Sequence, residues 1–164
     1  MIRPRRDSDL PALCAALQEV HVASNYPSVW PADPAAFLAP PGLGAWVAEL
    51  GGEPVGQVTL RPAGEPLPEW ITATGLGAAE VAVVSRLFVA PAARGRGLAR
   101  ALFRAAWAEA RTLGHRAILD VHVAAAGPIR LYEAEGWVRV ATMDAPWRDP
   151  DGTSPRMHVY RAPA

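Results

Sequence analysis

Lysine is absent from this chain, and all 16 of its basic residues are arginine. A chain without lysine cannot form a Schiff base through a side-chain amine, so arginine must provide the fixed positive charges. The 16 basic residues balance 16 acidic ones, and the formal net charge is zero. The overall charge therefore does not point to nucleic acid or to a strongly charged surface as the main partner.

Cysteine is nearly absent too, because Cys14 is the only one. It cannot form an internal disulfide, and without a cysteine cluster to hold zinc we expect no metal site. Long apolar runs are also missing. No stretch approaches the roughly 20 apolar residues of a membrane span, and the charged start of the chain is unlike a signal peptide. These absences predict a soluble, cytoplasmic protein with neither a membrane nor a nucleic acid as its partner.

The chain length sets the number of domains that we expect. A sequence of 164 residues with 51% hydrophobic content can bury one proper core, but it is too short for a second full domain. We therefore expect a single domain over residues 1–164.

The hydrophobic patterns and the turn residues predict an alternation of strands and helices. Strands are expected at residues 2–5, 45–50, 55–61, 81–89, 117–123, 137–142 and 157–161. Helices are expected from about residue 9, with Ser8 or Asp7 as the N-cap, and at residues 34–38, 98–113 and 128–135. Residues 62–79 show no period and predict a long loop or a strand extension. In the second half, strands alternating with helices imply a parallel or mixed sheet that is covered on both faces.

A glycine-rich turn follows the most strand-like run of the sequence, residues 81–89. Gly95 and Gly97 lie in this turn, and a helix is expected to begin at Leu98. The first amides of a helix lack acceptors and carry the positive end of the helix dipole, so they bind anions. Glycine lets the main chain approach a phosphate without a side chain in the way. The turn thus predicts a phosphate-binding site, although no Gly-Lys-Ser/Thr of a P-loop follows.

Arginines gather around the same turn. Arg96, Arg100 and Arg104 recur at intervals of four residues, where like charges on a helix repel by about 0.2 to 0.5 kcal/mol per pair. A bound polyanion would relieve this repulsion. For Arg94, Arg96 and Arg100 we favour phosphate contact, because they lie beside the glycines, whereas Arg104 and Arg111 fit an ordinary solvated face.

Two segments carry a resemblance to a known family. Residues 87–99 resemble motif A of the GNAT acetyltransferases, Gln/Arg-x-x-Gly-x-Gly/Ala, with Arg94, Gly97 and Ala99 at the three specified positions. Residues 129–137, which include Tyr132, resemble motif B, typically Ala-Ile-x-Leu-Tyr-Glu-x-x-Gly-Phe. With the first strand and helix, the hairpin and the last strands, the resemblance covers almost the whole chain.

The resemblance implies a fold and an acyl donor. The fold would be α/β, a mixed and mostly antiparallel sheet of about seven strands flanked by helices. A splayed parallel strand pair in it would hold the acyl-CoA, and acetyl-CoA would be the acyl-donor substrate. Main-chain groups of the end of the strand would pair with the pantetheine arm, and amides of the turn would hold the pyrophosphate. The first set is Leu87, Phe88 and Val89, and the second is Arg94, Gly95, Arg96, Gly97, Leu98 and Ala99, next to Arg100.

The chain departs from the family pattern at two positions. Ala125 stands where family members often carry an asparagine, seven residues before Tyr132. Val83 stands where some members carry a catalytic glutamate. One side-chain contact near the donor is therefore missing, and the general base must come from elsewhere.

Acetyl transfer to an amine needs an acid for the leaving thiolate, a base for the amine and donors for the oxyanion. Tyr132 matches the family's usual acid, and the amide of Val89 would be the oxyanion donor. The alternative for Tyr132 is a half-buried aromatic side chain whose hydroxyl only bonds the backbone.

Strand alternation puts Asp120 and His122 on one face of residues 117–123, together with Ile118, so either titratable side chain could be the base. Asp120 also falls where relatives resembling the ribosomal-protein alanine acetyltransferases carry a glutamate proposed as the base. A structural acceptor at Asp120 and a histidine with its bonds satisfied at His122 are nearly as good explanations.

Weaker candidates are spread over the rest of the chain. Glu80 and Ser85 could relay a proton through water, whereas Cys14 is expected in the core and His21 at a helix end. His115 and His158 have no motif to support a role. Aromatic residues in irregular segments could border the acceptor or only anchor loops, and they are Tyr26, Trp30, Trp70 and Trp147.

The sequence thus predicts an N-acetyltransferase that acts on a primary amine, with a small molecule favoured as the acceptor. A protein N-terminus is the alternative acceptor, which the turn at residues 149–152 mildly supports. A regulatory module that binds acyl-CoA without turnover is the alternative from another class of protein, and the two departures from the family pattern make it conceivable. Dimers are common in the family, so the resemblance also allows a homodimer.

Overall fold

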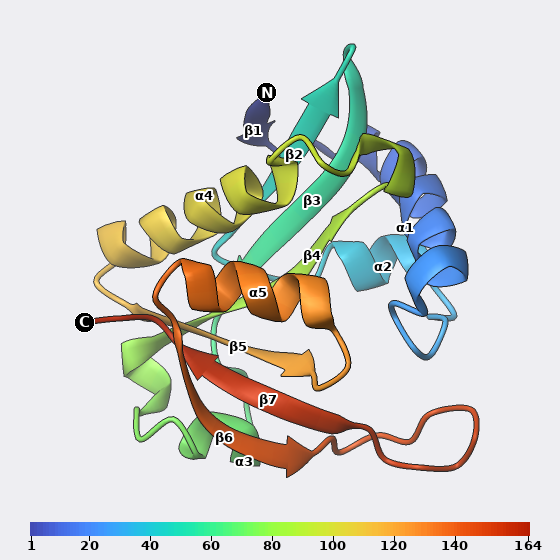
Figure 1. Ribbon diagram of the computed structural model, residues 1–164. Coiled ribbons are helices and arrows are strands. Elements are labelled where there is room, and N and C mark those ends of the chain that lie inside the picture. Colours follow the sequence, from blue (N-terminus) through green and yellow to red (C-terminus); the bar gives the residue numbers. More distant parts are fainter. The chain divides into compact units, whose positions relative to one another are not determined.

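The computed structural model describes residues 1–164 and contains seven strands, five α-helices and three 3-10 turns (Figure 1). The strands are β1 (Ile2–Pro4), β2 (Gly44–Leu50), β3 (Glu53–Arg61), β4 (Val81–Val89), β5 (Arg116–His122), β6 (Val138–Asp144) and β7 (Arg156–Arg161). The helices are α1 (Leu10–Ser24), α2 (Pro34–Leu38), α3 (Glu69–Thr72), α4 (Leu98–Thr112) and α5 (Ala126–Ala134). The 3-10 turns are η1 (Asp7–Asp9), η2 (Ala78–Glu80) and η3 (Pro91–Ala93). No helix combines the length and the apolar character needed to cross a membrane.

The strands form one sheet in the order β1-β2-β3-β4-β5-β7-β6. Its pairs β1–β2, β2–β3, β5–β7 and β6–β7 are antiparallel, and β4 and β5 pair in parallel where Val81–Val83 meet residues 116–118. A parallel pair needs a crossover connection, and α4 lies in the connection between these two strands. The expected α/β fold with a mixed, mostly antiparallel sheet is confirmed.

The chain divides into two compact units. The first contains residues 1–61 and 84–109, and the second contains residues 62–83 and 110–164. The chain passes from one unit to the other within β4 and again within α4.

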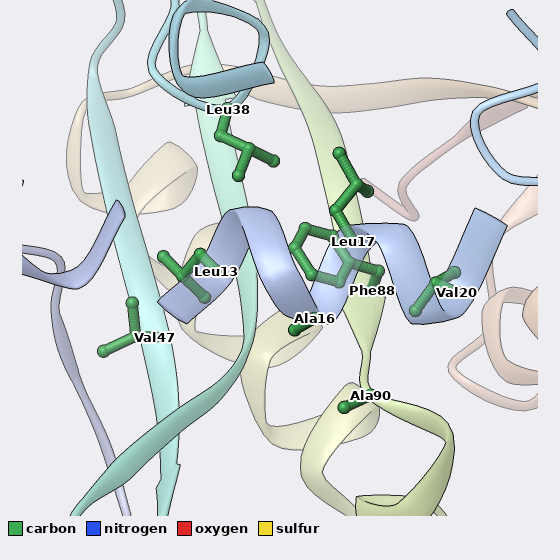
Figure 2. Close-up of a cluster of buried hydrophobic side chains, with 8 residues drawn as sticks. All are labelled: Leu13, Ala16, Leu17, Val20, Leu38, Val47, Phe88 and Ala90. Carbon is green, nitrogen blue, oxygen red and sulfur yellow. The ribbon is translucent and has the colours of Figure 1, made fainter. Parts of the chain in front are cut away.

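The core of the first unit lies under α1. Leu13, Ala16, Leu17 and Val20 follow helical spacing, so one face of this helix is apolar and buried. They gather with residues of α2, β2 and β4 in a single cluster, shown in Figure 2, which adds Leu38, Val47, Phe88 and Ala90. Burial of each large aliphatic side chain contributes about 1.5 to 3 kcal/mol, so this cluster fixes α1 and α2 against the strands.

The core of the second unit contains a helix that the sequence pattern did not predict. Residues 62–79 were expected to form a long loop or a strand extension, but α3 interrupts them, and Ile71 is fully buried there. Ile71 packs with Ala63, Val81, Val83 and Ile118. The prediction was wrong at this point because a single helical turn is too short to show a period, and burial of one side chain holds it in place.

The start of α1 also differs from the prediction. Neither Ser8 nor Asp7 caps the helix, because the 3-10 turn η1 precedes it and Asp9 occupies the N-cap position. The carboxylate of Asp9 accepts hydrogen bonds from the amide of Arg6 at 2.7 Å and from both terminal nitrogens of Arg3 at 2.8 Å. The side chain of Asp9 therefore binds Arg3 on β1 and makes no capping hydrogen bond to α1.

The Arg3–Asp9 pair is a largely buried ion pair in the first unit. Asp9 is only 5% exposed, and Nε of Arg3 donates to Glu49 on β2 at 2.6 Å. The hydrogen bonds from Arg3, with help from the Arg6 amide, hold the pKa of the Asp9 carboxyl below its ordinary value, although burial acts in the opposite direction. The ionised carboxylate thus stabilises the folded state above the ordinary aspartate pKa of about 3.9.

We expect Asp9→Asn to lower the melting temperature at neutral pH, because the substitution removes one of the two carboxylates that Arg3 pairs with and leaves only Glu49. As the pH falls below about 4, the wild type loses the same stabilisation by protonation, so the two melting temperatures converge. Thermal unfolding, recorded at about every whole pH value between pH 3 and pH 7, measures this difference. The exposed Asp7→Asn is the control, and a difference for Asp9→Asn that does not depend on pH would contradict the assignment.

Candidate functional site

The end of β4 carries the segment expected to pair with the donor. Leu87 is half-buried, whereas Phe88 and Val89 are 5% and 6% exposed. The amide after this segment, that of Ala90, donates to the carbonyl of Val55 on β3 at 2.7 Å. The segment is therefore held by its own side chains and by the neighbouring strand.

Gly56 on β3 lets the two main chains come unusually close. A Cβ atom at this position would lie 2.5 Å from the carbonyl oxygen of Phe88 and 3.1 Å from Cα of Val89. Both are main-chain atoms, which cannot move aside without moving the strand. Only glycine fits here, because any side chain would push β4 out of its present path.

The path of β4 bends just before this segment. Arg86 has a φ of 55°, in the left-handed region that residues with a side chain rarely adopt, although it lies inside a strand. Its Nε donates to the carbonyl of Phe37 on α2 at 3.0 Å, and its guanidinium carbon lies 3.8 Å from the centre of the Phe37 ring.

The turn after β4 has the geometry of an anion site. Gly95 and Gly97 have φ values of 78° and 75°, and an added Cβ would meet nothing within 4 Å at either glycine. Helical bonding begins with the amide of Ala101, which donates to the carbonyl of Gly97 at 3.0 Å. The amides from Gly97 to the first turn of α4 thus have no acceptor within the helix, and this arrangement suits a pyrophosphate.

The arginines of the turn differ in their surroundings. Nε of Arg94 donates to the carbonyl of Val89 at 3.3 Å, and both terminal nitrogens donate to Oγ of Ser24 at 3.2 Å. Arg94 therefore ties the turn to the end of α1 through its side chain. Arg96 and Arg100 are exposed at the start of α4, where a positive charge favours a bound anion.

In the second unit, β5 presents different side chains on its two faces. It pairs with β7 so that Leu119 lies opposite Tyr160, and Asp120 opposite Val159. Residues directly opposite in a sheet share a face, so Leu119 and Val121 lie on the side of Tyr160, while Asp120 and His122 lie on the other. This alternation is the one that the sequence predicted.

Tyr132 lies over the Tyr160 side of the sheet. Its ring centre is 6.0 Å from that of Tyr160 and 6.5 Å from that of Trp137, and the side chain is 6% exposed (α5 and β7, Figure 1). The helix that carries it begins at Ala126, two residues earlier than predicted, with Pro128 inside its first turn. Tyr132 and the pair Asp120–His122 thus lie on opposite faces of β5.

The neighbouring Tyr160 is fully buried, and its hydroxyl donates to Oε2 of Glu133 at 3.0 Å. Burial, reinforced by the bond to Glu133, raises the pKa of Tyr160 above its ordinary value. A hydroxyl that is already committed to a carboxylate is a poor proton donor to another molecule. Tyr160 is therefore a poor candidate for the acid.

Of the two base candidates, Asp120 and His122, the histidine already accepts a main-chain hydrogen bond. The amide of Ala124 donates to Nδ1 of the exposed His122 at 3.0 Å. An amide can only donate, so the neutral imidazole carries its proton on Nε2 and has no other lone pair to offer. The bond therefore weighs against His122 as the acceptor of an amine proton.

Other candidates have contacts of a structural kind. Oε2 of Glu80 accepts from the amide of Gly77 at 2.6 Å, and the hydroxyl of Ser85 lies 2.7 Å from that of Thr59. Cys14 packs against the cluster of Figure 2, as predicted, and burial raises the pKa of its thiol.

The histidines outside β5 fall in places without a clear chemical task. His21 lies at the end of α1, as predicted, and its Nδ1 donates to the carbonyl of Pro27 at 2.7 Å. His158 lies between Thr142 and Arg139, at 2.7 Å and 3.2 Å from its two ring nitrogens. Nδ1 of His115 is buried without a hydrogen-bond partner.

The four aromatic residues of the irregular segments separate into two kinds. Tyr26 packs against the core cluster of the first unit, and Trp70 packs against that of the second. Trp30 and Trp147 are 37% and 40% exposed. Tyr26 and Trp70 thus anchor their segments, whereas Trp30, whose ring centre lies 5.2 Å from that of His21, and Trp147 keep part of their surface exposed.

Sequence reasoning missed two residues of this site. A glycine inside a strand pattern signals a close main-chain approach, so Gly56 could have been found from its position in residues 55–61. Arg86 gave no such signal, because arginine is not a residue that predicts positive φ.

We expect Gly56→Ala to displace the main chain at Phe88 and Val89, since the added methyl group meets main-chain atoms. Overpacking of this kind costs about 1 to 3 kcal/mol, and a displaced strand should bind coenzyme A more weakly. Calorimetric titration with coenzyme A measures the change, beside Gly127→Ala, where an added Cβ meets nothing within 4 Å. Unchanged affinity in Gly56→Ala would show that the segment does not hold the donor.

Comparison with known proteins agrees with this geometry. N-acetyltransferase 8 of Mus musculus is 34% identical over 102 residues, which are 62% of this chain, and the chain spans only 41% of that protein. The structure of a ribosomal-protein-alanine N-acetyltransferase from Brucella melitensis superposes with a TM-score of 0.76 at 23% identity, covering 100% of this chain and 99% of that one. NAA60 of Arabidopsis thaliana, solved in complex with acetyl-CoA, superposes with a TM-score of 0.73 at 20% identity, covering 98% and 96%.

The family assignment does not depend on these superpositions, which show the fold alone. The sequence model of the acetyltransferase (GNAT) family matches residues 10–137, which include both the turn after β4 and helix α5. The resemblance seen in the sequence is confirmed, and the chain belongs to the acetyltransferase (GNAT) family.

Proposed function

We propose that residues 1–164 form one N-acetyltransferase domain that transfers the acetyl group of acetyl-CoA directly to a primary amine. The observation that carries the proposal is the turn from Arg94 to Leu98, which presents main-chain amides to an anion directly after the strand end Leu87–Val89. A cytoplasmic location belongs to the same proposal, and the single cysteine supports it.

On the donor side, the main chain does most of the binding. The amides at the start of α4 would hold the pyrophosphate, with Arg96 and Arg100 adding charge. Main-chain groups of Leu87 and Phe88 would pair with the pantetheine arm. The amide of Val89 would donate to the carbonyl oxygen of the thioester, where negative charge develops during attack.

Tyr132 would supply the proton for the thiolate. It is 6% exposed, so its hydroxyl is shielded from water, and a proton transfer there meets little competition from solvent. The match of Tyr132 to the family motif supports this choice, and the bond of Tyr160 to Glu133 argues against the neighbouring tyrosine.

Asp120 would accept the proton of the amine, directly or through water. Its side chain is half-buried on the face of β5 that also carries His122. The hydrogen bond that occupies Nδ1 of His122 argues against His122 as the base.

For the acceptor, we propose a small molecule with a primary amine. Trp30 and Trp147 are exposed and would suit a partly apolar amine. A protein N-terminus is the second candidate, favoured by the fold similarity to an enzyme named for ribosomal-protein alanine.

A thiol-release assay with acetyl-CoA tests the proposal against a panel of small amines, amino acids and N-terminal peptides. We expect turnover with one acceptor class and a fall in kcat of roughly 100-fold or more in Tyr132→Phe, the scale of general acid catalysis. Tyr160→Phe is the matched control, because its hydroxyl is bonded to Glu133, and it should keep its kcat. Binding of acetyl-CoA without turnover across the panel would favour a regulatory module instead.

The pH dependence of kcat tests the choice of base. Asp120→Asn should lower kcat by about 10- to 100-fold near neutral pH, where the amine arrives as an ammonium ion. The loss should shrink toward pH 10, roughly the pKa of an aliphatic amine, because the amine then needs no base. If His122→Gln reproduces this profile and Asp120→Asn does not, the roles are reversed.

A further inference from the structure

Arg86 has a main-chain conformation that its residue type disfavours. Arg86 and Asn25 are the non-glycine residues with positive φ, both at 55°, and Asn25 ends helix α1, where this conformation is common. Arg86 lies inside a strand, and a residue with a Cβ atom is strained in the left-handed region. Some interaction of its side chain must offset that strain, since glycine would adopt the conformation at no cost.

The side chain of Arg86 makes two contacts with the same residue, Phe37. Nε donates to the carbonyl of Phe37 at 3.0 Å, and the guanidinium carbon lies 3.8 Å from the centre of the Phe37 ring. A charge-assisted hydrogen bond and a cation–π contact thus act on the same partner. The partner is 49 positions away in sequence, so this contact depends on the tertiary fold.

The helix that Arg86 contacts is itself firmly held. The carbonyl of Leu38, the next residue after Phe37, accepts from Nε2 of Gln57 at 3.0 Å and also from Arg5. Leu38 is fully buried in the cluster of Figure 2, and Phe37 packs against this cluster. The side chain of Arg86 therefore binds a fixed point.

The residues that follow Arg86 are held at their other end by separate contacts. Phe88 points into the same cluster, and the Ala90 amide donates to the carbonyl of Val55 at 2.7 Å (Figure 2). The segment Leu87–Val89 thus lies between Arg86 and the Ala90 amide, and its main-chain groups bind the donor in the proposed function. The bend at Arg86 sets the direction in which these groups point.

We propose that Arg86 is a positioning residue of the acetyl transfer: by clamping onto Phe37 it locks the bend of β4 and so orients the main chain of Leu87–Val89 toward the acyl donor. The proposal rests on the proposed function for the role of that segment. Arg86 contacts neither substrate, and it acts through the amide of Val89.

The variant Arg86→Gly tests whether the side chain of Arg86 fixes the bend of β4. In Arg86→Gly the backbone strain disappears together with the clamp, so the fold should be kept, whereas the bend is no longer locked. Phe37→Leu removes the ring but keeps the main-chain carbonyl, so it tests the stacking contact alone. Arg6→Gln, at an exposed arginine, is the control for loss of one positive charge.

The first measurement needs no turnover. Hydrogen exchange of the amides of residues 87–89 is compared in the wild type, Arg86→Gly, Phe37→Leu and the double variant, with thermal unfolding as a check of the fold. We expect exchange in this segment to become about tenfold faster in Arg86→Gly, and the double variant to add little more, since both changes break one clamp. Unchanged exchange in Arg86→Gly would overturn the clamp.

The second measurement is kinetic. With the best amine of the panel, Arg86→Gly should lower kcat about tenfold at a nearly unchanged KM for the amine, since the Val89 amide is no longer aimed at the oxyanion. A kcat within twofold of the wild type, at faster exchange, would overturn the positioning role. If the wild type itself turns over no amine, the proposed function fails, and titration of Arg86→Gly with acetyl-CoA decides instead: weaker binding supports the orientation of the segment, and equal binding refutes it.

Discussion

The bend of β4 at Arg86 is the constraint on which the proposed donor site depends. A regular strand would carry Leu87–Val89 onward in the pleat, whereas a residue in the left-handed region changes the direction of the main chain. Gly56 lets the bent strand approach β3, and Phe88 fixes it in the core. The turn with two glycines then delivers the amides of the first turn of α4. Each of these features would be misplaced if β4 ran straight.

Because the chain has no lysine, arginine makes all the hydrogen bonds from basic side chains that hold the fold together. Several arginines donate to main-chain carbonyls far from them in sequence: Arg5 to Leu38, Arg86 to Phe37, Arg116 to Ala162 and Arg161 to Thr74. A planar guanidinium with several fixed donors suits this task better than a flexible ammonium group. Arg96 and Arg100 are exposed beside the first turn of α4, where a positive charge favours an anion. One residue type thus fills two roles, which differ in burial and in partners.

The proposed acid and base follow from the two-residue period of a strand. Asp120 and Leu119 are neighbours in sequence but face opposite sides of β5, and Tyr132 lies over the Leu119 side through its contact with Tyr160. A neutral hydroxyl can lie in that apolar layer at little cost, whereas a carboxylate cannot. Asp120 is accordingly only half-buried, on the other face.

The sequence by itself determined what depends on near neighbours: the period of α1, the alternation along β5, the turn with Gly95 and Gly97 and the match to the family. It did not reveal α3, because one helical turn carries no period and depends on the burial of Ile71. Nor did it reveal the left-handed Arg86 or the bond of Tyr160 to Glu133, since both depend on partners tens of residues away. Local periodicity is encoded within a few residues, whereas strain, close approach and hydrogen-bond partners exist only once the tertiary fold brings distant segments together.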